Sequence, residues 1–422
     1  MTESKRARTR TLLLYAQDSK GMGHITRTLT IARHLLAAYP KCVGYIATES
    51  AIAREFALPE RCDYTKLPTR VTVGDEPETK TEAEAASQHF HQVRSRILRE
   101  TVLGLSPDLV LVDHEPLGHK GEFREGLLAL KKQCPATRFV FGLRDIMDDS
   151  ERIRTQWREL GVYDALEHLY DGIAVYGSRN LYDVADAYDL PSSVRAKLHY
   201  CGYIVREPSG VGREAIRVRY GLPSDGLLVV VTVGSGSDGY PVLAGTQSAL
   251  LRMQARNPNL NAILVTGPLM PPKHQEALRS KETTRCRIVS RADNFELVAA
   301  ADAAVSMGGY NSVCEALVAG TPLVIVPRVT HKIEQLIRAD ALAGHGLVRW
   351  VHPRNLETHQ MDAALGWALT LNRDAHARLV RETIPSFDGA ARLTAYLAQW
   401  LAEDRISVTS PVEEEPSMVP AA

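Results

Sequence analysis

The sequence predicts an α/β protein with two doubly wound, Rossmann-like domains, each built on a parallel sheet. Three observations lead to this fold class. Apolar runs of strand length alternate with helical patterns, and the alternation starts a second time after the turn-rich stretch at residues 206–212. The length of 422 residues is also sufficient for two domains of this kind.

Each half contributes five apolar runs that we expect to be buried strands. These runs are residues 11–16, 42–47, 108–113, 138–143 and 171–176 in the first half, and 227–233, 261–266, 285–289, 302–306 and 323–326 in the second. After the first run, Ile25, Leu29, Ala32 and Leu36 fall on one face of a helix that ends near Tyr39. The expected segments are a basic disordered tail (1–10), a first domain (11–206), a second domain (207–386), a final helix (387–403) and a disordered acidic tail (404–422).

Composition narrows the range of partners. The formal net charge of zero removes the long-range attraction that nucleic-acid-binding proteins use, so we expect no nucleic-acid partner. Six scattered cysteines without a C-x-x-C pair predict reduced thiols, and no stretch is apolar enough to span a membrane, so we expect a cytoplasmic protein, monomeric or homodimeric. Arg94, Arg96 and Arg99 form either a solvated charged face or a peripheral membrane contact.

The stretch at residues 302–327, DAAVSMGGYNSVCEALVAGTPLVIVP, predicts a ligand site. It is expected to be a strand, a two-glycine turn, a short helix at about 312–319 and a second strand. The right-handed crossover of such a unit places the turn at the carboxyl edge of the sheet, where ligands bind. Gly308 and Gly309 lack a Cβ, so a diphosphate can approach the backbone and the positive end of the next helix.

Glu315 allows two interpretations. It is expected one turn into the short helix, where its carboxylate can accept the vicinal hydroxyls of a ribose. Alternatively, Ser312 and Glu315 form an S-x-x-E capping box, in which the carboxylate binds only a backbone N–H group. The spacing leaves both interpretations open.

The first strand leads into a turn with a candidate base. The turn holds Gly21 and Gly23, and His24 follows at the start of the predicted helix. The helix dipole favours a neutral imidazole, which can accept a proton near pH 7. A histidine that only caps the helix or packs against it is the alternative.

The segment GGYNSVCEALVAGTPLVIVP, followed by HKIEQ, resembles the donor-site signature of the GT-B glycosyltransferases of the MurG-like family 28. In that family the glycine turn holds the donor diphosphate, here Gly308 and Gly309, and the glutamate binds the ribose, here Glu315. The segment after the next strand reaches the donor sugar, here through His331 and Gln335. The other positions of the motif that we expect at the donor are Tyr310, Asn311 and Ser312. The resemblance implies two domains that face each other across a cleft, with a last helix that crosses back to the first domain.

The resemblance also implies roles for loops outside this signature. The loop VGSGSDG would border the diphosphate through Gly234, Ser235 and Ser237, although a flexible turn without a ligand is the alternative. Gly21 and Gly23 would face the donor from the opposite domain, with His24 as the base for the acceptor hydroxyl or as a contact to the sugar.

Two further strand ends are expected to line the acceptor side of the cleft. Asp113, His114 and Glu115 follow one strand, and Arg144 and Asp145 follow the next. Asp145 or Glu115 would share the role of base with His24, whereas a salt bridge between Asp145 and Arg144 is the alternative. Consecutive residues of an extended segment point to opposite sides, so we expect no metal site here.

Two other resemblances leave an alternative reaction open. DSKGMGHITR is similar to the opening of the nucleotide-sugar hydrolase of pseudaminic acid synthesis, in which the corresponding histidine activates water. VDHEP and GLRDIMDD are similar to blocks of a bacterial set of predicted glycosyltransferases, for which no substrate is implied.

These observations predict an inverting, metal-independent glycosyltransferase that moves a sugar from a nucleotide diphosphate donor, expected to be a UDP-sugar, to a hydroxyl or amine. The acceptor is a small molecule, a lipid or a glycan, and no cofactor is expected beyond the donor. Met307 stands where family 28 has a basic residue and where retaining GT-B enzymes carry a second glutamate, which disfavours retention. The alternatives are a nucleotide-sugar hydrolase, a noncatalytic sugar-nucleotide binding protein, and a 2-epimerase, which needs more acids in the cleft.

Overall fold

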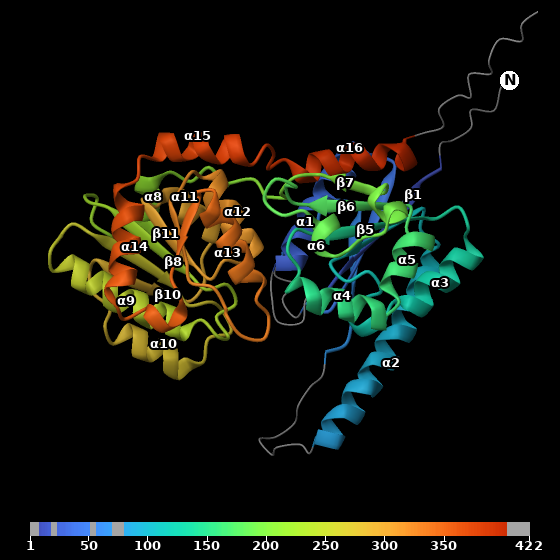
Figure 1. Ribbon diagram of the computed structural model, residues 1–422, viewed down its shortest axis with the longest axis horizontal. Helices are drawn as coiled ribbons and strands as arrows, with labels where there is room; N and C mark the ends of the chain where they lie inside the picture. The colour runs from blue at the N-terminus through green and yellow to red at the C-terminus, as the bar shows by residue number, and fades with distance from the viewer. Residues whose placement is uncertain (1–7, 18–22, 51–55, 70–79, 403–422) are drawn as a thin grey trace, which may run out of the picture.

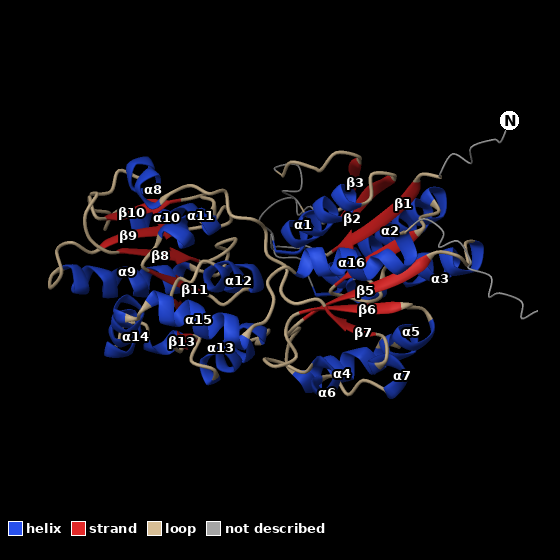
Figure 2. Ribbon diagram, turned by 90° about the horizontal axis from the view of Figure 1, so that it is seen from above, coloured by secondary structure: helices blue, strands red, loops and turns tan. Residues whose placement is uncertain are grey.

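The chain forms two parallel sheets that lie side by side, each flanked by helices (Figures 1 and 2). The computed structural model describes residues 8–17, 23–50, 56–69 and 80–402. Residues 1–7 of the predicted N-terminal tail, the whole predicted C-terminal tail and Gly21 lie outside these residues. Arg10, which we expected in the N-terminal tail, is instead the first residue of the first strand.

The first sheet has the strand order β3-β2-β1-β4-β5-β6-β7, with every pairing parallel. Its strands are β1 (Arg10–Ala16), β2 (Cys42–Thr48), β3 (Cys62–Lys66), β4 (Leu109–Asp113), β5 (Arg138–Arg144), β6 (Gly172–Tyr176) and β7 (Leu198–Tyr200). Its helices are α1 (Gly23–Ala38), α2 (Lys80–Leu105), α3 (Arg124–Gln133), α4 (Ser150–Glu159), α5 (Val162–His168), α6 (Val184–Ala187) and α7 (Ser192–Arg195), with a 3-10 turn, η2 (His119–Gly121).

The second sheet has the order β10-β9-β8-β11-β12-β13, again all parallel. Its strands are β8 (Leu228–Thr232), β9 (Asn261–Val265), β10 (Cys286–Val289), β11 (Ala303–Ser306), β12 (Leu323–Ile325) and β13 (Val348–Trp350). Its helices are α8 (Arg213–Arg219), α9 (Tyr240–Gln254), α10 (Pro272–Arg279), α11 (Asn294–Ala300), α12 (Tyr310–Val318), α13 (Glu334–Gly344), α14 (His359–Thr370) and α15 (Arg373–Thr383), with the 3-10 turn η3 (Pro353–Asn355). The order 3-2-1-4-5-6 in both sheets is the doubly wound Rossmann order, so the predicted fold class is confirmed.

Both faces of each sheet are buried. In β1, Leu12 and Leu14 belong to one apolar cluster, whereas Leu13 and Tyr15 belong to another on the opposite face. Successive side chains of a strand point to opposite faces, so a run with no polar residue requires helices on both sides. This is why the apolar runs predicted the strands well.

The last helix, α16 (Gly389–Leu401), joins the two halves. From α15 above the second sheet the chain runs to α16, which lies over the first sheet and packs on α1 (Figures 1 and 2). The hydroxyl of Tyr39, at the end of α1, donates a hydrogen bond to Thr394 O of α16 at 2.9 Å. The final helix therefore crosses back to the first half, as the resemblance implied.

Candidate functional site

His24 and Asp113 form a hydrogen-bonded pair at the carboxyl edge of the first sheet. His24 is the second residue of α1, Asp113 is the last residue of β4, and His24 Nδ1 lies 2.7 Å from Asp113 Oδ2. Arg27, one turn along α1, donates to both carboxylate oxygens, at 3.1 and 2.6 Å. Asp113, which we expected on the acceptor side, is thus the partner of the predicted base.

The charge state of Asp113 decides which nitrogen of His24 carries the proton. Burial raises the pKa of the Asp113 carboxyl, but the charge of Arg27 and the hydrogen bond with His24 outweigh it and lower the pKa to about 2. Because the carboxylate is charged and can only accept, the proton between the two side chains belongs to His24 Nδ1. In this tautomer Nε2 is the basic atom of the imidazole.

His114 lies against this pair. Its backbone has a φ of 70°, which a non-glycine residue adopts only where the surroundings enforce it, and its N–H donates to Gly142 O at 2.9 Å. Its ring centroid is 4.7 Å from that of His24, and its buried Nδ1 has no hydrogen-bond partner. Burial, with the nearby charge of Arg144, lowers the pKa of His114 well below its usual value, so the ring is neutral.

Asp145 and Arg144 have partners that the sequence did not indicate. Asp145 forms a buried ion pair at 3.0 Å with Arg338 of α13, in the second domain. Arg144 instead donates to the carbonyl oxygens of Ile146 and Met147, at 3.0 to 3.3 Å. The predicted alternative of an Asp145–Arg144 salt bridge is therefore wrong, and a carboxylate held by Arg338 is not placed to act as a base.

Glu115 lines a different cavity. Its Oε2 lies 3.7 Å from His119 Nδ1, and both residues border a pocket of about 190 Å³ beside α4. His114 also borders this pocket, which brings the pocket next to the His24 ring. The three consecutive residues at the end of β4 therefore have different places: Asp113 supports His24, whereas His114 and Glu115 border the pocket.

The glycine turn before α12 has the open backbone that the sequence predicted. A Cβ on Gly308, whose φ is 80°, would come within 2.7 Å of Ile325 Cγ2, so this position requires glycine. A Cβ on Gly309, the N-cap of α12, would meet nothing within 4 Å. The start of α12 is thus accessible at Gly309, and its N–H groups are available for an anion.

The first turn of α12 contacts the base-bearing end of α1. Asn311 Nδ2 donates to Gly23 O at 3.3 Å, and the Arg27 guanidinium lies 5.2 Å from the centre of the Tyr310 ring. The Tyr310 hydroxyl accepts from Ile204 N at 2.9 Å, in the segment that connects the two sheets. These contacts place His24 and the glycine turn on facing helix starts. No contact of Ser312 indicates a role for it.

Glu315 does not cap its helix. The helix starts at Tyr310, two residues earlier than predicted, so Ser312 lies inside it and the capping-box interpretation is wrong. Glu315 Oε1 instead accepts from Arg206 Nε at 2.8 Å, and Arg206 also pairs with Asp293 at 2.7 Å. Burial raises the pKa of the Glu315 carboxyl, against the opposing charge of Arg206.

Arg206 nearly fills the space at Glu315. The cavity between α1 and α12 that both residues line has a volume of only about 10 Å³, which is enough for a water molecule but not for a ribose. A ribose can therefore reach this carboxylate only if the Arg206 side chain moves. No sequence pattern pointed to this residue, which lies in the connection between the two sheets.

His331 and Gln335, the two residues expected to contact the donor sugar, differ in their exposure to solvent. His331 is exposed, and its carbonyl oxygen accepts from Arg152 of the first domain. Gln335 is buried, and its Oε1 accepts from Arg328 N at 2.9 Å. Between them, Glu334 has a buried Oε2 with no hydrogen-bond partner, which makes it a further candidate for binding hydroxyl groups. Its position directly before Gln335 in HKIEQ was the only sequence signal.

The loop after β8 is joined to the segment that carries Gln335. Gly234 has a φ of 63° and open space where a Cβ would be, whereas Ser237 is exposed. Ser235 O accepts from Leu269 N at 2.8 Å, which fixes the loop at its base. Asp238 pairs with Arg328 at 2.6 Å, so the two loops approach each other.

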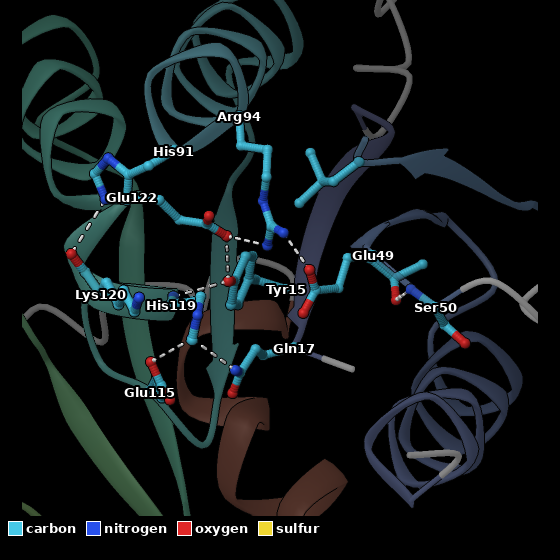
Figure 3. A network of polar contacts seen from close by, with 12 residues as sticks. Tyr15, Gln17, Glu49, Ser50, His91, Arg94, Glu115, His119, Lys120 and Glu122 are labelled. Atoms are coloured by element: carbon cyan, nitrogen blue, oxygen red, sulfur yellow. Dashed lines mark hydrogen bonds and ion pairs between the residues drawn. The ribbon is translucent and has the colours of Figure 1, made fainter. Parts of the chain in front are cut away.

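A buried polar network lies behind the pocket, at the ends of β1 and β2 (Figure 3). Arg94 of α2 bonds Glu49 and, at 2.7 Å, Glu122, while the hydroxyl of Tyr15 donates to Glu122 at 2.8 Å. Tyr15 also accepts from the backbone N–H of His119, which secures the pocket loop. Arg94 is therefore inside the protein, and its predicted place on a solvated or membrane-facing surface is wrong.

The described residues contain neither a metal-binding cluster nor a membrane-spanning helix. No cluster of three or more His, Cys, Asp or Glu side chains there has the arrangement of a metal site. Within the same residues, every helix is too short or too polar to cross a bilayer.

Comparisons with known proteins found similarity to glycosyltransferases. Residues 228–379 match the glycosyltransferase family 28 C-terminal domain. Over 187 residues the chain is 25% identical to the uncharacterized glycosyltransferase MK0977 of Methanopyrus kandleri. That match covers 44% of this chain and 50% of the relative, so the chain spans about half the length of the curated relative it matches.

Two solved structures share the whole fold. The calicheamicin glycosyltransferase CalG4 superposes with a TM-score of 0.64 at 17% identity, over 94% of this chain and 99% of that one. Phytolacca americana UGT2, solved with UDP-2fluoro-glucose and pterostilbene, gives a TM-score of 0.64 at 15% identity, over 93% and 99%. Residues 228–379 therefore match the family 28 C-terminal domain, and the chain as a whole shares the two-domain fold of these glycosyltransferases.

Proposed function

We propose that the chain transfers a sugar from a nucleotide diphosphate donor, expected to be a UDP-sugar, to an acceptor hydroxyl or amine with inversion at the anomeric carbon. The observation that carries this proposal is the position of the His24–Asp113 pair. It stands at the start of α1, which is hydrogen-bonded through Gly23 to Asn311 at the start of α12. A base thus faces the turn proposed for the diphosphate.

The His24–Asp113 pair would remove the acceptor proton. Asp113 accepts the Nδ1–H bond and holds the ring, so Nε2 takes the proton as the acceptor oxygen or nitrogen bonds to the anomeric carbon. The bond from that carbon to the diphosphate oxygen breaks, and its electron pair leaves with the diphosphate. Attack from the face opposite the leaving group inverts the configuration.

The second domain would stabilise the departing diphosphate. Its charge falls on the N–H groups at Gly309 and the first turn of α12, where the helix dipole is positive. Arg206 is a guanidinium next to this helix, and in the structure it donates to Glu315. We propose that ribose hydroxyls replace it on Glu315 and that Arg206 turns to the phosphates. With a guanidinium and helix N–H groups at the leaving group, the proposed reaction uses no metal ion.

A turnover assay with and without acceptor tests the proposal. UDP-sugars are incubated with a panel of hydroxylated aromatic, lipid and sugar acceptors, and products are identified by mass spectrometry. We expect UDP release that depends on an acceptor and a glycosylated product. Release of free sugar at the same rate without acceptor would instead identify the hydrolase, in which the same histidine activates water.

His24→Ala tests the role of the base. We expect turnover to fall by about 10²–10⁴-fold, while the affinity for UDP stays the same because the substitution leaves the second domain intact. His34→Ala is the matched control: His34 lies on the same helix, but its ring bonds Thr30 O within that helix. Unchanged turnover in His24→Ala would remove His24 from the mechanism.

A further inference from the structure

The pocket of about 190 Å³ beside α4 is separate from the cavity at Glu315, and the two share no lining residue. Its position next to His24 is set by His114, which borders the pocket and has its ring centroid 4.7 Å from that of His24. A molecule that contacts His114 in this pocket would therefore be one ring away from the proposed base. The chemistry of the lining indicates what kind of molecule it accepts.

One wall of the pocket is apolar. Trp157 and Ile153 of α4 are both buried, and Leu117 comes from the loop after β4. The Trp157 ring is held by the rings of Tyr163 and Tyr188, at centroid distances of 5.7 and 5.4 Å, so the wall is rigid. Such a wall favours a flat hydrocarbon or aromatic body.

The carboxylates in the lining already have partners. Asp148 Oδ1 accepts from Ile333 N at 2.8 Å, and its Oδ2 lies 3.3 Å from Arg152. Glu115 Oε2 lies 3.7 Å from His119 Nδ1. The Asp148 carboxylate is therefore not left to attract a cationic ligand, which leaves Glu115 as the remaining acid of the lining.

Two lysines in the same lining have no such partner. Lys120 comes from the first domain and Lys332 from the second, and both are exposed. Among the residues that the structure describes, no carboxylate lies within 4 Å of either ammonium group. Within the described residues the buried His114 Nδ1 also lacks a hydrogen-bond partner, and the Arg144 guanidinium donates to the carbonyl oxygens of Ile146 and Met147. The pocket is therefore apolar on one side and positively charged at its mouth.

We propose that this pocket binds the acceptor, and that the acceptor is a small hydroxylated molecule with a flat apolar body and one anionic group, a carboxylate or a phosphate. The inference rests on the proposed function, and it deepens that function by naming the acceptor class. The body packs on Trp157, the anionic group lies between Lys120 and Lys332, and the hydroxyl faces His24. Because the two lysines belong to different domains, the pocket is complete only when the domains are together.

Matched pairs of probes test the charge requirement. Binding of para-hydroxyphenylpropionate is compared with binding of its methyl ester, and para-hydroxybenzylphosphonate with its dimethyl ester, by calorimetry on the full chain. We expect each anion to bind roughly tenfold more tightly than its ester, which is the effect of two partly screened charge contacts. The anion that binds more tightly shows whether the anionic group of the acceptor is a carboxylate or a phosphate.

Lysine variants assign the preference to the pocket. In the double variant Lys120→Gln and Lys332→Gln we expect the preference for the anion to fall to less than roughly threefold. Lys132→Gln, an exposed lysine at the end of α3, is the matched control and should keep the full preference. UDP affinity in Lys120→Gln should stay at the wild-type value, because Lys120 belongs to the first domain.

Several outcomes would overturn this inference: equal binding of anion and ester, an equal effect of the Lys132 control, or no binding of any anion at millimolar concentration. The proposed function fails in a different way. If the anions bind through the lysines but no nucleotide sugar is turned over, the pocket assignment stands and glycosyl transfer does not. If neutral and anionic acceptors are glycosylated at equal rates, the proposed glycosyl transfer stands and the anionic acceptor class is wrong.

Discussion

Asp145, at the end of the first sheet, and Arg338, on α13 of the second domain, form an ion pair at 3.0 Å with both side chains about 3% exposed. Arg338 also donates to Gly308 O, in the glycine turn, at 3.0 Å. One side chain thus joins the first domain to the turn proposed for the donor diphosphate. Three contacts nearby reinforce this junction, from Asp148 to Ile333 N, from Arg152 to His331 O, and from Asn311 to Gly23 O.

Breaking this pair should destabilise the protein strongly. Arg338→Met leaves the Asp145 carboxylate buried without a counter-charge, which costs about 3–5 kcal/mol. The double variant Arg338→Met with Asp145→Leu should recover most of the loss, because it removes both buried charges. Urea unfolding measures both effects. As a control, Arg252→Met breaks the exposed pair with Asp362, where solvent already screens the charges, and should change stability much less. Equal losses at the two sites would contradict the structural role of Arg338.

Asp113→Asn should separate catalysis from donor binding. The asparagine can donate to His24 Nδ1 and favour the other tautomer, so Nε2 would no longer be the basic atom. We expect kcat to fall by about 10²–10⁴-fold with little change in KM for the donor. Calorimetric binding of UDP shows that the variant is folded. A variant that retains wild-type kcat would show that Asp113 does not orient the base.

The pH dependence of stability provides a second readout for Asp113. The pKa of its carboxyl is lowered from 3.8 to about 2 by folding, so the unfolded chain binds this proton at a higher pH than the native protein. The stabilisation is therefore fully present above about pH 4 and is lost as the pH falls toward 2. We expect the difference in unfolding free energy between wild type and Asp113→Asn to shrink over that interval. A difference that is constant from pH 5 to pH 2 would show that the carboxylate is not selectively stabilised as the anion.

The proposed exchange of Arg206 for ribose at Glu315 can be tested with matched nucleotides. We expect wild-type protein to bind UDP more tightly than 2′,3′-dideoxyuridine diphosphate, by roughly tenfold, which is the effect of one hydrogen bond to a charged group. In Glu315→Gln this preference should largely disappear. Arg206→Gln should keep the preference but weaken binding of both diphosphates, because the guanidinium is proposed to bind the phosphates. Equal binding of the two nucleotides to the wild type would rule out the ribose role of Glu315.

The sequence predicted the central strands because their burial is visible in local composition. Parallel strands that are covered on both faces are apolar through their central positions, and β1, β4, β5, β8 and β11 carry polar residues only at their ends. The edge strands β3, β7 and β13 were missed, since they have three to five residues and are only partly buried. The start of α12 was placed two residues late, because nothing in GGYNS distinguishes a turn residue from the first residues of a helix.

By itself, the sequence determined the fold class and the open glycine turn before α12. Strands and helices follow from the pattern of neighbouring residues, and the two glycines leave the backbone accessible. Only the tertiary structure decided which charged groups meet. Asp113 joins His24 across 89 positions, Arg206 meets Glu315 across 109, and Arg338 meets Asp145 across 193. A buried carboxylate needs a positively charged partner, and several arginines of the chain could provide it. The periodicity of apolar residues in the sequence does not indicate which arginine forms the pair. Which arginine pairs with which carboxylate depends on how the two sheets pack together. This packing makes Asp113 a partner of His24 and makes Asp145 part of the contact between the domains.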